Sequence, residues 1–137
     1  MSGSANNPPS PAPGLPVGRI TIRPDFLAAA RGHKQVRSGV LVQAARSDAA
    51  GAGVRAGFTA TRKIGGAVQR NRAKRRLREA ARQTLPELGR AGCDYVFVAR
   101  AATPAHPWPA LLDDVRTALI SLARLLENDG SGQTPRP

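Results

Sequence analysis

The residues best suited to chemistry in this chain are nine cations crowded between Arg62 and Arg82. Seven are arginines and two are lysines, against the single acid Glu79, so this segment carries +8 of the net charge of +12. Because a guanidinium group can donate two parallel hydrogen bonds to one phosphate, a run this rich in arginine favours a phosphate-bearing partner. The nine cations are Arg62, Lys63, Arg70, Arg72, Lys74, Arg75, Arg76, Arg78 and Arg82.

The spacing of this segment predicts a helix that binds nucleic acid. At 100° per residue, a helix over 67–83 places its small and apolar side chains on one narrow arc and leaves the rest to the cations. A merely solvated face is disfavoured, because like charges on adjacent turns repel each other and the signs do not alternate. An anionic membrane surface is disfavoured because so small an arc cannot insert into lipid. The arc consists of Ala73, Leu77, Ala80 and Ala81.

Asn71 lies inside the basic run, and two interpretations of it are open. Asparagine is a poor residue for a helix interior unless its amide has a partner. Just after the break at Gly65 and Gly66 it could occupy the first turn, where it is tolerated, or it could contact the ligand.

Aromatic residues make up 4% of the chain, so we expect charge rather than base stacking to supply most of the affinity for nucleic acid.

Residues that could cut RNA without help are sparse. A protein nuclease needs a metal-binding carboxylate cluster or a pair of histidines acting as acid and base. His33 and His106 are far apart in the chain, and the adjacent acids 113–114 suit the start of a helix, where they complement its dipole. Cys93 is the only cysteine and can neither form an internal disulfide nor supply a metal cage. We expect no catalytic residue and no metal bound by the protein alone, and Trp108 is interpreted as a packing anchor.

The chain is long enough for one domain with a single core. Residues 1–18 are rich in proline and 128–137 are poor in apolar residues, so both are expected to be disordered tails around one RNA-binding domain over 19–127. The first residues lack the basic and apolar regions of a secretory signal, and no apolar stretch is long enough to span a membrane. These features predict a cytoplasmic protein that does not bind membranes.

The expected elements run in the order α-β-β-α-β-α. A short helix begins at Pro24, and strands over 39–45 and 54–61 are expected to pair as a hairpin. The basic helix should end near Thr84, because Pro86 blocks its continuation. A buried strand over 94–99 and an amphipathic helix over 111–126 complete the domain. The predicted fold is an α/β (α+β) two-layer sandwich, a small mixed sheet with packed helices, in which 54–99 form a parallel crossover.

The stretch 57–82, GFTATRKIGGAVQRNRAKRRLREAAR, resembles the signature of the protein subunit of bacterial ribonuclease P, and the likeness covers about 20–126. The resemblance implies that the β-α-β crossover is left-handed, against the usual rule. It further implies that the protein, a monomer on its own, joins a catalytic RNA that removes the 5′ leader from precursor tRNA. Hydrolysis would be performed by the RNA with bound Mg²⁺, while the protein binds the leader and broadens substrate specificity.

The resemblance also assigns site residues. Leader binding is expected in a groove between the first helix and the sheet, where Phe26 matches a family aromatic, whereas Ala30 and Gln43 replace aromatics common in the family. The full set for the leader is Phe26, Ala30, Leu41, Gln43, Arg62 and Arg100. The set for the catalytic RNA is Arg62, Lys63, Arg70, Asn71, Arg72, Lys74, Arg75, Arg76 and Arg78.

Two other functions remain open at this point. One is a general RNA- or DNA-binding protein with no part in cleavage, and the other is a protein that cuts RNA alone. Specific stimulation of leader removal distinguishes an accessory subunit from a general binding protein. Activity that survives removal of the catalytic RNA would establish a protein that cuts RNA alone.

Overall fold

A five-stranded sheet organises the molecule, which we describe from a computed structural model over residues 14–132, with side chains described as far as Asn128. The strand order across the sheet is β1-β4-β5-β3-β2. In chain order the elements are β1 (Val17–Arg19), α1 (Arg23–Ala30), β2 (His33–Val36), β3 (Val40–Arg46), β4 (Val54–Thr59), α2 (Ala67–Leu88), β5 (Cys93–Ala99) and α3 (Trp108–Gly132).

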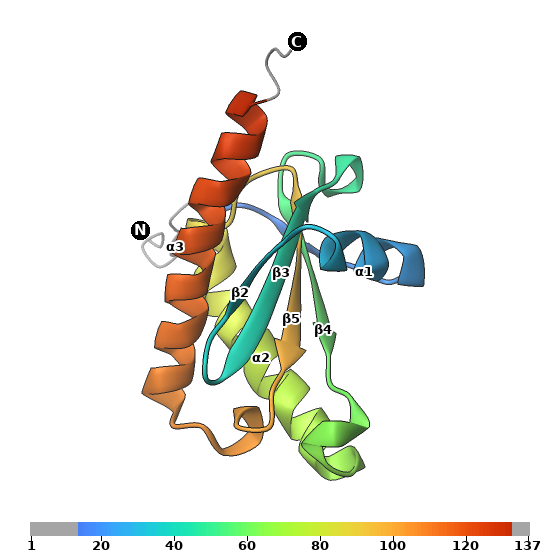
Figure 1. Cartoon of the computed structure of the whole chain (residues 1–137), viewed down its shortest axis with the longest axis vertical. Coiled ribbons are helices and arrows are strands. Elements are labelled where there is room, and N and C mark those ends of the chain that lie inside the picture. The colour runs from blue at the N-terminus through green and yellow to red at the C-terminus, as the bar shows by residue number, and fades with distance from the viewer. Residues whose placement is uncertain (1–13, 133–137) are drawn as a thin grey trace, which may run out of the picture.

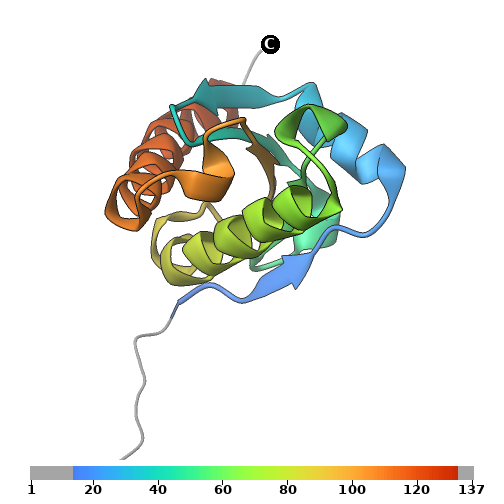
Figure 2. The ribbon, with the colours of Figure 1, turned by 90° about the horizontal axis from the view of Figure 1, so that it is seen from below.

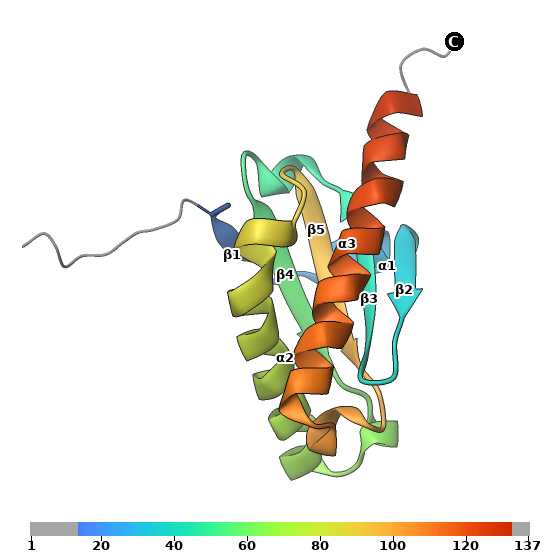
Figure 3. The ribbon, with the colours of Figure 1, turned by 90° about the vertical axis from the view of Figure 1, so that its left-hand side faces the viewer.

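The sheet is mixed, and helices cover both of its faces unequally. β4 runs parallel to both β1 and β5, whereas β3 is antiparallel to β5 and β2. α2 and α3 lie side by side along one face, and the short α1 crosses part of the other (Figures 1 and 3). The view from below shows the sheet between these helices (Figure 2). The expected α+β fold, a small mixed sheet with packed helices, is confirmed.

Successive side chains along each strand point to opposite faces of the sheet. On β3, Val40, Val42 and Ala44 are buried against α2 and α3, so Leu41 and Gln43 point to the face that α1 crosses. β5 is central and is buried on both faces, with Phe97 in the larger core. Each large apolar side chain buried there contributes about 1.5–3 kcal/mol. The largest members of this core are Tyr95, Phe97, Leu77, Leu85, Leu111, Leu119, Leu122 and Leu126.

The prediction that the strands over 39–45 and 54–61 pair as a hairpin is wrong. β3 and β4 do not pair with each other, because β5 lies between them and pairs with both. The expected element order also missed β1 and β2, which are short edge strands with exposed or half-buried residues. Neither carries an apolar alternation that would indicate a strand. The parallel crossover from β4 through α2 to β5 is confirmed, and its left-handedness stays a prediction.

α2 continues through Pro86 to Leu88 instead of ending near Thr84. Leu85 is fully buried and accepts a backbone hydrogen bond from Gly89 at 2.9 Å, so packing of the last turn outweighs the loss of the proline N–H. The folded part also exceeds the expected domain of 19–127 at both ends, since β1 begins at Val17 and α3 runs to Gly132. Of the tails expected over 1–18 and 128–137, residues 1–13 and 133–137 lie outside the described residues.

Candidate nucleic-acid interface

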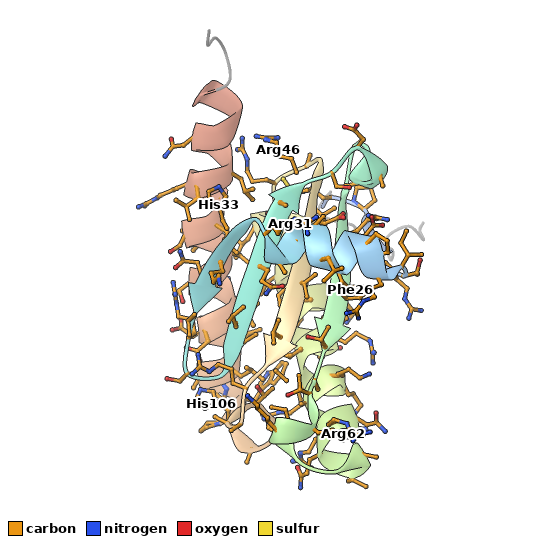
Figure 4. The ribbon with its side chains drawn as sticks, turned by 45° about the vertical axis from the view of Figure 1, so that its right-hand side comes forward. Phe26, Arg31, His33, Arg46, Arg62 and His106 are labelled. Atoms are coloured by element: carbon orange, nitrogen blue, oxygen red, sulfur yellow. The ribbon has the colours of Figure 1, made fainter. Side chains whose placement is uncertain are left out.

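The basic run lies on α2 and on the 3-10 turn Arg62–Ile64 that precedes it. The predicted apolar arc is confirmed, because all four of its residues are buried against the sheet and α3. The opposite side of the helix is lined with exposed cations, and Arg62 marks the end of the molecule where this surface begins (Figure 4). The exposed members of the run are Arg62, Lys63, Arg72, Arg75, Arg78 and Arg82.

Two arginines of α2 also hold the segment before α3. Arg76 donates from Nη1 to the carbonyl of Thr103 and from Nη2 to the carbonyl of His106, both at 2.6 Å, and its guanidinium lies 5.8 Å from the centre of the Trp108 ring. Arg72 Nε donates to the carbonyl of Pro104 at 2.8 Å. Burial, followed by the charge of Arg72, lowers the pKa of Arg76. Arg72 and Arg76 of the basic run therefore stabilise the fold. Trp108 packs against the core, as the sequence predicted.

The start of α2 is fixed by Arg70. Its Nη1 donates to the carbonyl of Gly65 at 3.0 Å, and Gly65 has φ 141°, a conformation that favours glycine. Asn71 lies exposed one residue further on, in the second turn of the helix rather than the first. This position leaves its amide open to a ligand, and the contact itself stays a prediction.

The residues predicted to bind the leader gather around the other face of the sheet. Phe26 of α1 lies over Gly57 of β4 so closely that a Cβ on Gly57 would be 2.5 Å from the ring. Leu41 and Gln43 point to the same face, opposite Val98 and Val96 of β5. Ala30 is exposed at the end of α1.

Two of the predicted cations lie at one end of this face. Arg62 and Arg100 follow the C-terminal ends of the parallel strands β4 and β5, so both lie at the same end of the sheet. α1 crosses toward the other end, near Arg31 in Figure 4. The predicted set is therefore brought to one face, with a strip of β3 and β5, half-buried at Leu41 and Val98, between α1 and the two cations.

The position of α1 is set by a charged network that sequence reasoning missed. Arg55 of β4 donates to both carboxylate oxygens of Asp94 of β5, at 2.9 and 2.6 Å, and to Asp25 of α1 at 3.0 Å. The hydrogen bonds that Arg55 donates to the Asp94 carboxylate raise the pKa of Arg55, although desolvation opposes this shift. Arg55 and Asp94 are register partners in the parallel pair, and this pairing becomes visible only once the strand order is known.

Among the described residues, the two histidines lie in separate places, and one of them contacts an acid of the last helix. His33 and His106 lie far apart (Figure 4). Asp114 accepts a hydrogen bond from the Gly39 backbone at 2.9 Å and lies 3.2 Å from His106 Nε2, so it joins two loops. In the part of the chain that the structure describes, no three His, Cys, Asp or Glu side chains are placed to share a metal ion. None of the described helices is long and apolar enough to cross a membrane.

The fold and these surfaces define a small basic α+β protein with a cationic helix on one side of its sheet and a partly uncovered sheet face on the other. A family model described as Ribonuclease P matches residues 17–123. The chain therefore belongs to the ribonuclease P protein family, as its sequence signature indicated.

Relatives and solved structures agree with this assignment. The chain is 55% identical over 117 residues to the ribonuclease P protein component of Caulobacter vibrioides strain NA1000 / CB15N, covering 85% of this chain and 78% of the relative. It is 54% identical over 102 residues to that of Ruegeria pomeroyi, covering 73% and 82%. The RNase P protein from Thermotoga maritima has the same fold, with a TM-score of 0.65 at 23% identity over 75% of this chain and 96% of that one. The protein from Staphylococcus aureus gives 0.64 at 22% identity, over 79% and 96%.

Proposed function

We propose that this protein is the accessory subunit of a ribonucleoprotein ribonuclease P, and that it assists a catalytic RNA in removing the 5′ leader from precursor tRNA in the cytoplasm. Membership of the family supports the link to ribonuclease P and tRNA processing. The catalytic step belongs to the RNA and its bound Mg²⁺, and the protein, a monomer on its own, contributes no catalytic side chain. Its role is to bind both the catalytic RNA and the leader.

The surface of α2 and the preceding turn is proposed to bind the catalytic RNA. Arg62, Lys63 and Arg75 are exposed there, and Asn71 lies among them. Guanidinium groups on successive helical turns can bind phosphates along one RNA backbone, and binding of this kind releases counterions. Arg72 and Arg76 serve this surface in a second way, because they anchor the segment before α3 and keep α2 fixed against it.

The face crossed by α1 is proposed to bind the leader. Its floor is the strip of β3 and β5 that carries Leu41 and Gln43, with Phe26 beside it. A base stacked on an aromatic side chain contributes about 1–3 kcal/mol, so the replacement of two family aromatics by Ala30 and Gln43 weakens stacking. Cations at the end of the strip, Arg62 and Arg100, then carry more of the binding.

One observation carries the proposal. The ribonuclease P family model matches residues 17–123, and this part of the chain exposes its arginines along α2. The decisive experiment is cleavage of a precursor tRNA at low Mg²⁺ by the catalytic RNA, with the protein, without it, and with the protein alone. We expect cleavage to require both components. A protein that binds precursor and mature tRNA equally and does not stimulate cleavage would be a general RNA- or DNA-binding protein. Cleavage by the protein alone would place the active site in its side chains.

A further inference from the structure

A groove between β1 and the second half of α2 adjoins the cationic surface of α2, with which it shares Arg75 and Arg78. It has a volume of about 470 Å³ and is walled mainly by apolar atoms of Val17, Ala56, Phe58 and Pro86. The groove stays open because the side chains between the strands and the helix are small, with Ala56 on β4 and Ala81 on α2. Its size lies within the range of 300–1,000 Å³ that is typical of sites for small ligands.

Four arginines also line this groove, namely Arg19, Arg75, Arg78 and Arg82. Arg78 lies over Phe58, with its guanidinium carbon 5.5 Å from the ring centre, so the charge borders the apolar surface directly. The one acid in the lining is Glu79, and its salt bridge with Arg82 lowers its pKa to about 2. The remaining three arginines leave the rim strongly positive.

This combination of charge and shape selects a ligand with a flat apolar body and anionic groups on either side of it. A nucleotide within an RNA strand has both, since its base is flat and its flanking phosphates are negative. A duplex offers no such body, because its bases are stacked and paired inside the helix. An anionic lipid is a poorer match, because its long acyl chain would extend beyond the groove.

We propose that the groove binds one unpaired nucleotide of the RNA strand that follows the arginines of α2. The base packs against Val17, Phe58 and Pro86, and Arg19 and Arg75 bind the adjoining phosphates. That this strand belongs to the catalytic RNA rests on the proposed function. Binding of an unpaired base in the groove does not depend on it. The structure thereby assigns a binding role to Arg19, which the sequence signature left without one.

The test compares two ten-nucleotide RNAs with the same phosphates, one abasic at every position and one abasic at every position except a central adenosine. Binding to the full chain is measured by fluorescence anisotropy. Stacking of one base on an aromatic ring contributes about 1–3 kcal/mol. Phe58 already stacks on Phe97 and lies under Arg78, so we expect the lower end of this range, an improvement in affinity of about 5-fold. Equal affinities for the two RNAs would overturn the proposal.

Matched substitutions on the two edge strands locate the effect. Val17→Trp fills the groove but leaves all arginines in place, and Val36→Trp makes the same change on β2, at the opposite edge of the sheet. Both valines are exposed, at 41% and 49%, so both variants should fold. We expect Val17→Trp to abolish the advantage of the adenosine without changing affinity for the fully abasic RNA. Persistence of the advantage in Val17→Trp, or its equal loss in both variants, would contradict a site in this groove.

Crosslinking identifies the occupant directly. A photoreactive benzoylphenylalanine in place of Val17, in the full chain, should crosslink to the adenosine of the bound RNA. A crosslink to residues 1–13 instead would show that the chain's own N-terminal segment occupies the groove and would overturn the proposal. Failure of these tests while the protein still stimulates leader cleavage would refute the groove alone and leave the proposed function standing.

Discussion

Replacing Arg55 with methionine should lower the free energy of unfolding by about 3 kcal/mol, because it leaves the buried carboxylate of Asp94 without its partner. The Asp94 side chain is 5% exposed and loses both of its hydrogen bonds to the guanidinium, at 2.9 and 2.6 Å. Removal of one partner of a buried ion pair costs about 3–5 kcal/mol, and we take the lower end because the Arg55 side chain is 16% exposed. For a domain of this size the loss corresponds to about 12 °C in melting temperature.

Two further variants separate this cause from simple loss of charge. Arg55→Met combined with Asp94→Val removes both charges, and we expect it to be more stable than Arg55→Met alone, since no carboxylate is left unpaired. Asp25→Asn breaks the more exposed arm of the network and should cost about 0.5–1 kcal/mol. The free energy of unfolding is measured at pH 7 by urea titration, followed by circular dichroism.

The reasoning would be refuted if Arg55→Met stayed within about 1 kcal/mol of the unchanged protein. It would equally be refuted if the double variant were less stable than the single one. Arg116→Met on α3, which is exposed, controls for the loss of one positive charge and should change stability by less than about 0.5 kcal/mol.

Three other predictions address the core and the two proposed RNA surfaces. Burial raises the pKa of Tyr95 to about 12. Tyr95 is the only tyrosine of the chain, so the absorbance change at 295 nm that reports ionisation of its phenol should have its midpoint near pH 12 rather than 10. The raised pKa favours the neutral phenol in the folded state, so its contribution to stability is complete below pH 10 and is lost as the pH rises toward 12. Gly57→Ala should displace the Phe26 ring and weaken leader binding, at a cost of about 1–3 kcal/mol in stability from overpacking. Arg70→Ala with Arg72→Ala should impair binding to the catalytic RNA more than Phe26→Ala does, and should reduce the slope of log K against log[salt] in filter binding.

Each of these predictions has a control. A tyrosinate midpoint at pH 10 in the folded protein would contradict burial of the phenol. Gly66→Ala introduces the same methyl group where nothing lies within 4 Å, so it should leave leader binding unchanged, and equal effects of the two glycine variants would exclude the close approach as the cause. Equal losses from the arginine pair and from Phe26→Ala, with the catalytic RNA as the only ligand, would contradict the division of the surface into two sites.

The sequence alone determined the parts of this protein that depend on neighbours along the chain. The helical arc of Ala73, Leu77 and Ala80 follows from a period of 3.6 residues, and the cations on the remaining surface follow from the same period. The ordered signature over 57–82 was specific enough to indicate the family that the comparisons confirm. These features need no knowledge of which strands meet.

Only the tertiary structure decided how the strands pair and which distant side chains meet. β5 lies between β3 and β4 because it is buried on both faces, and local patterns favoured a hairpin there instead. The contact of Arg55 with Asp94 follows from that pairing. The approach of Phe26 to Gly57 and the groove beside β1 follow from the packing of α1 and β1 against β4. Each joins segments more than thirty residues apart in the chain, so it depends on strand order and register, which the periodicity of a single segment does not encode.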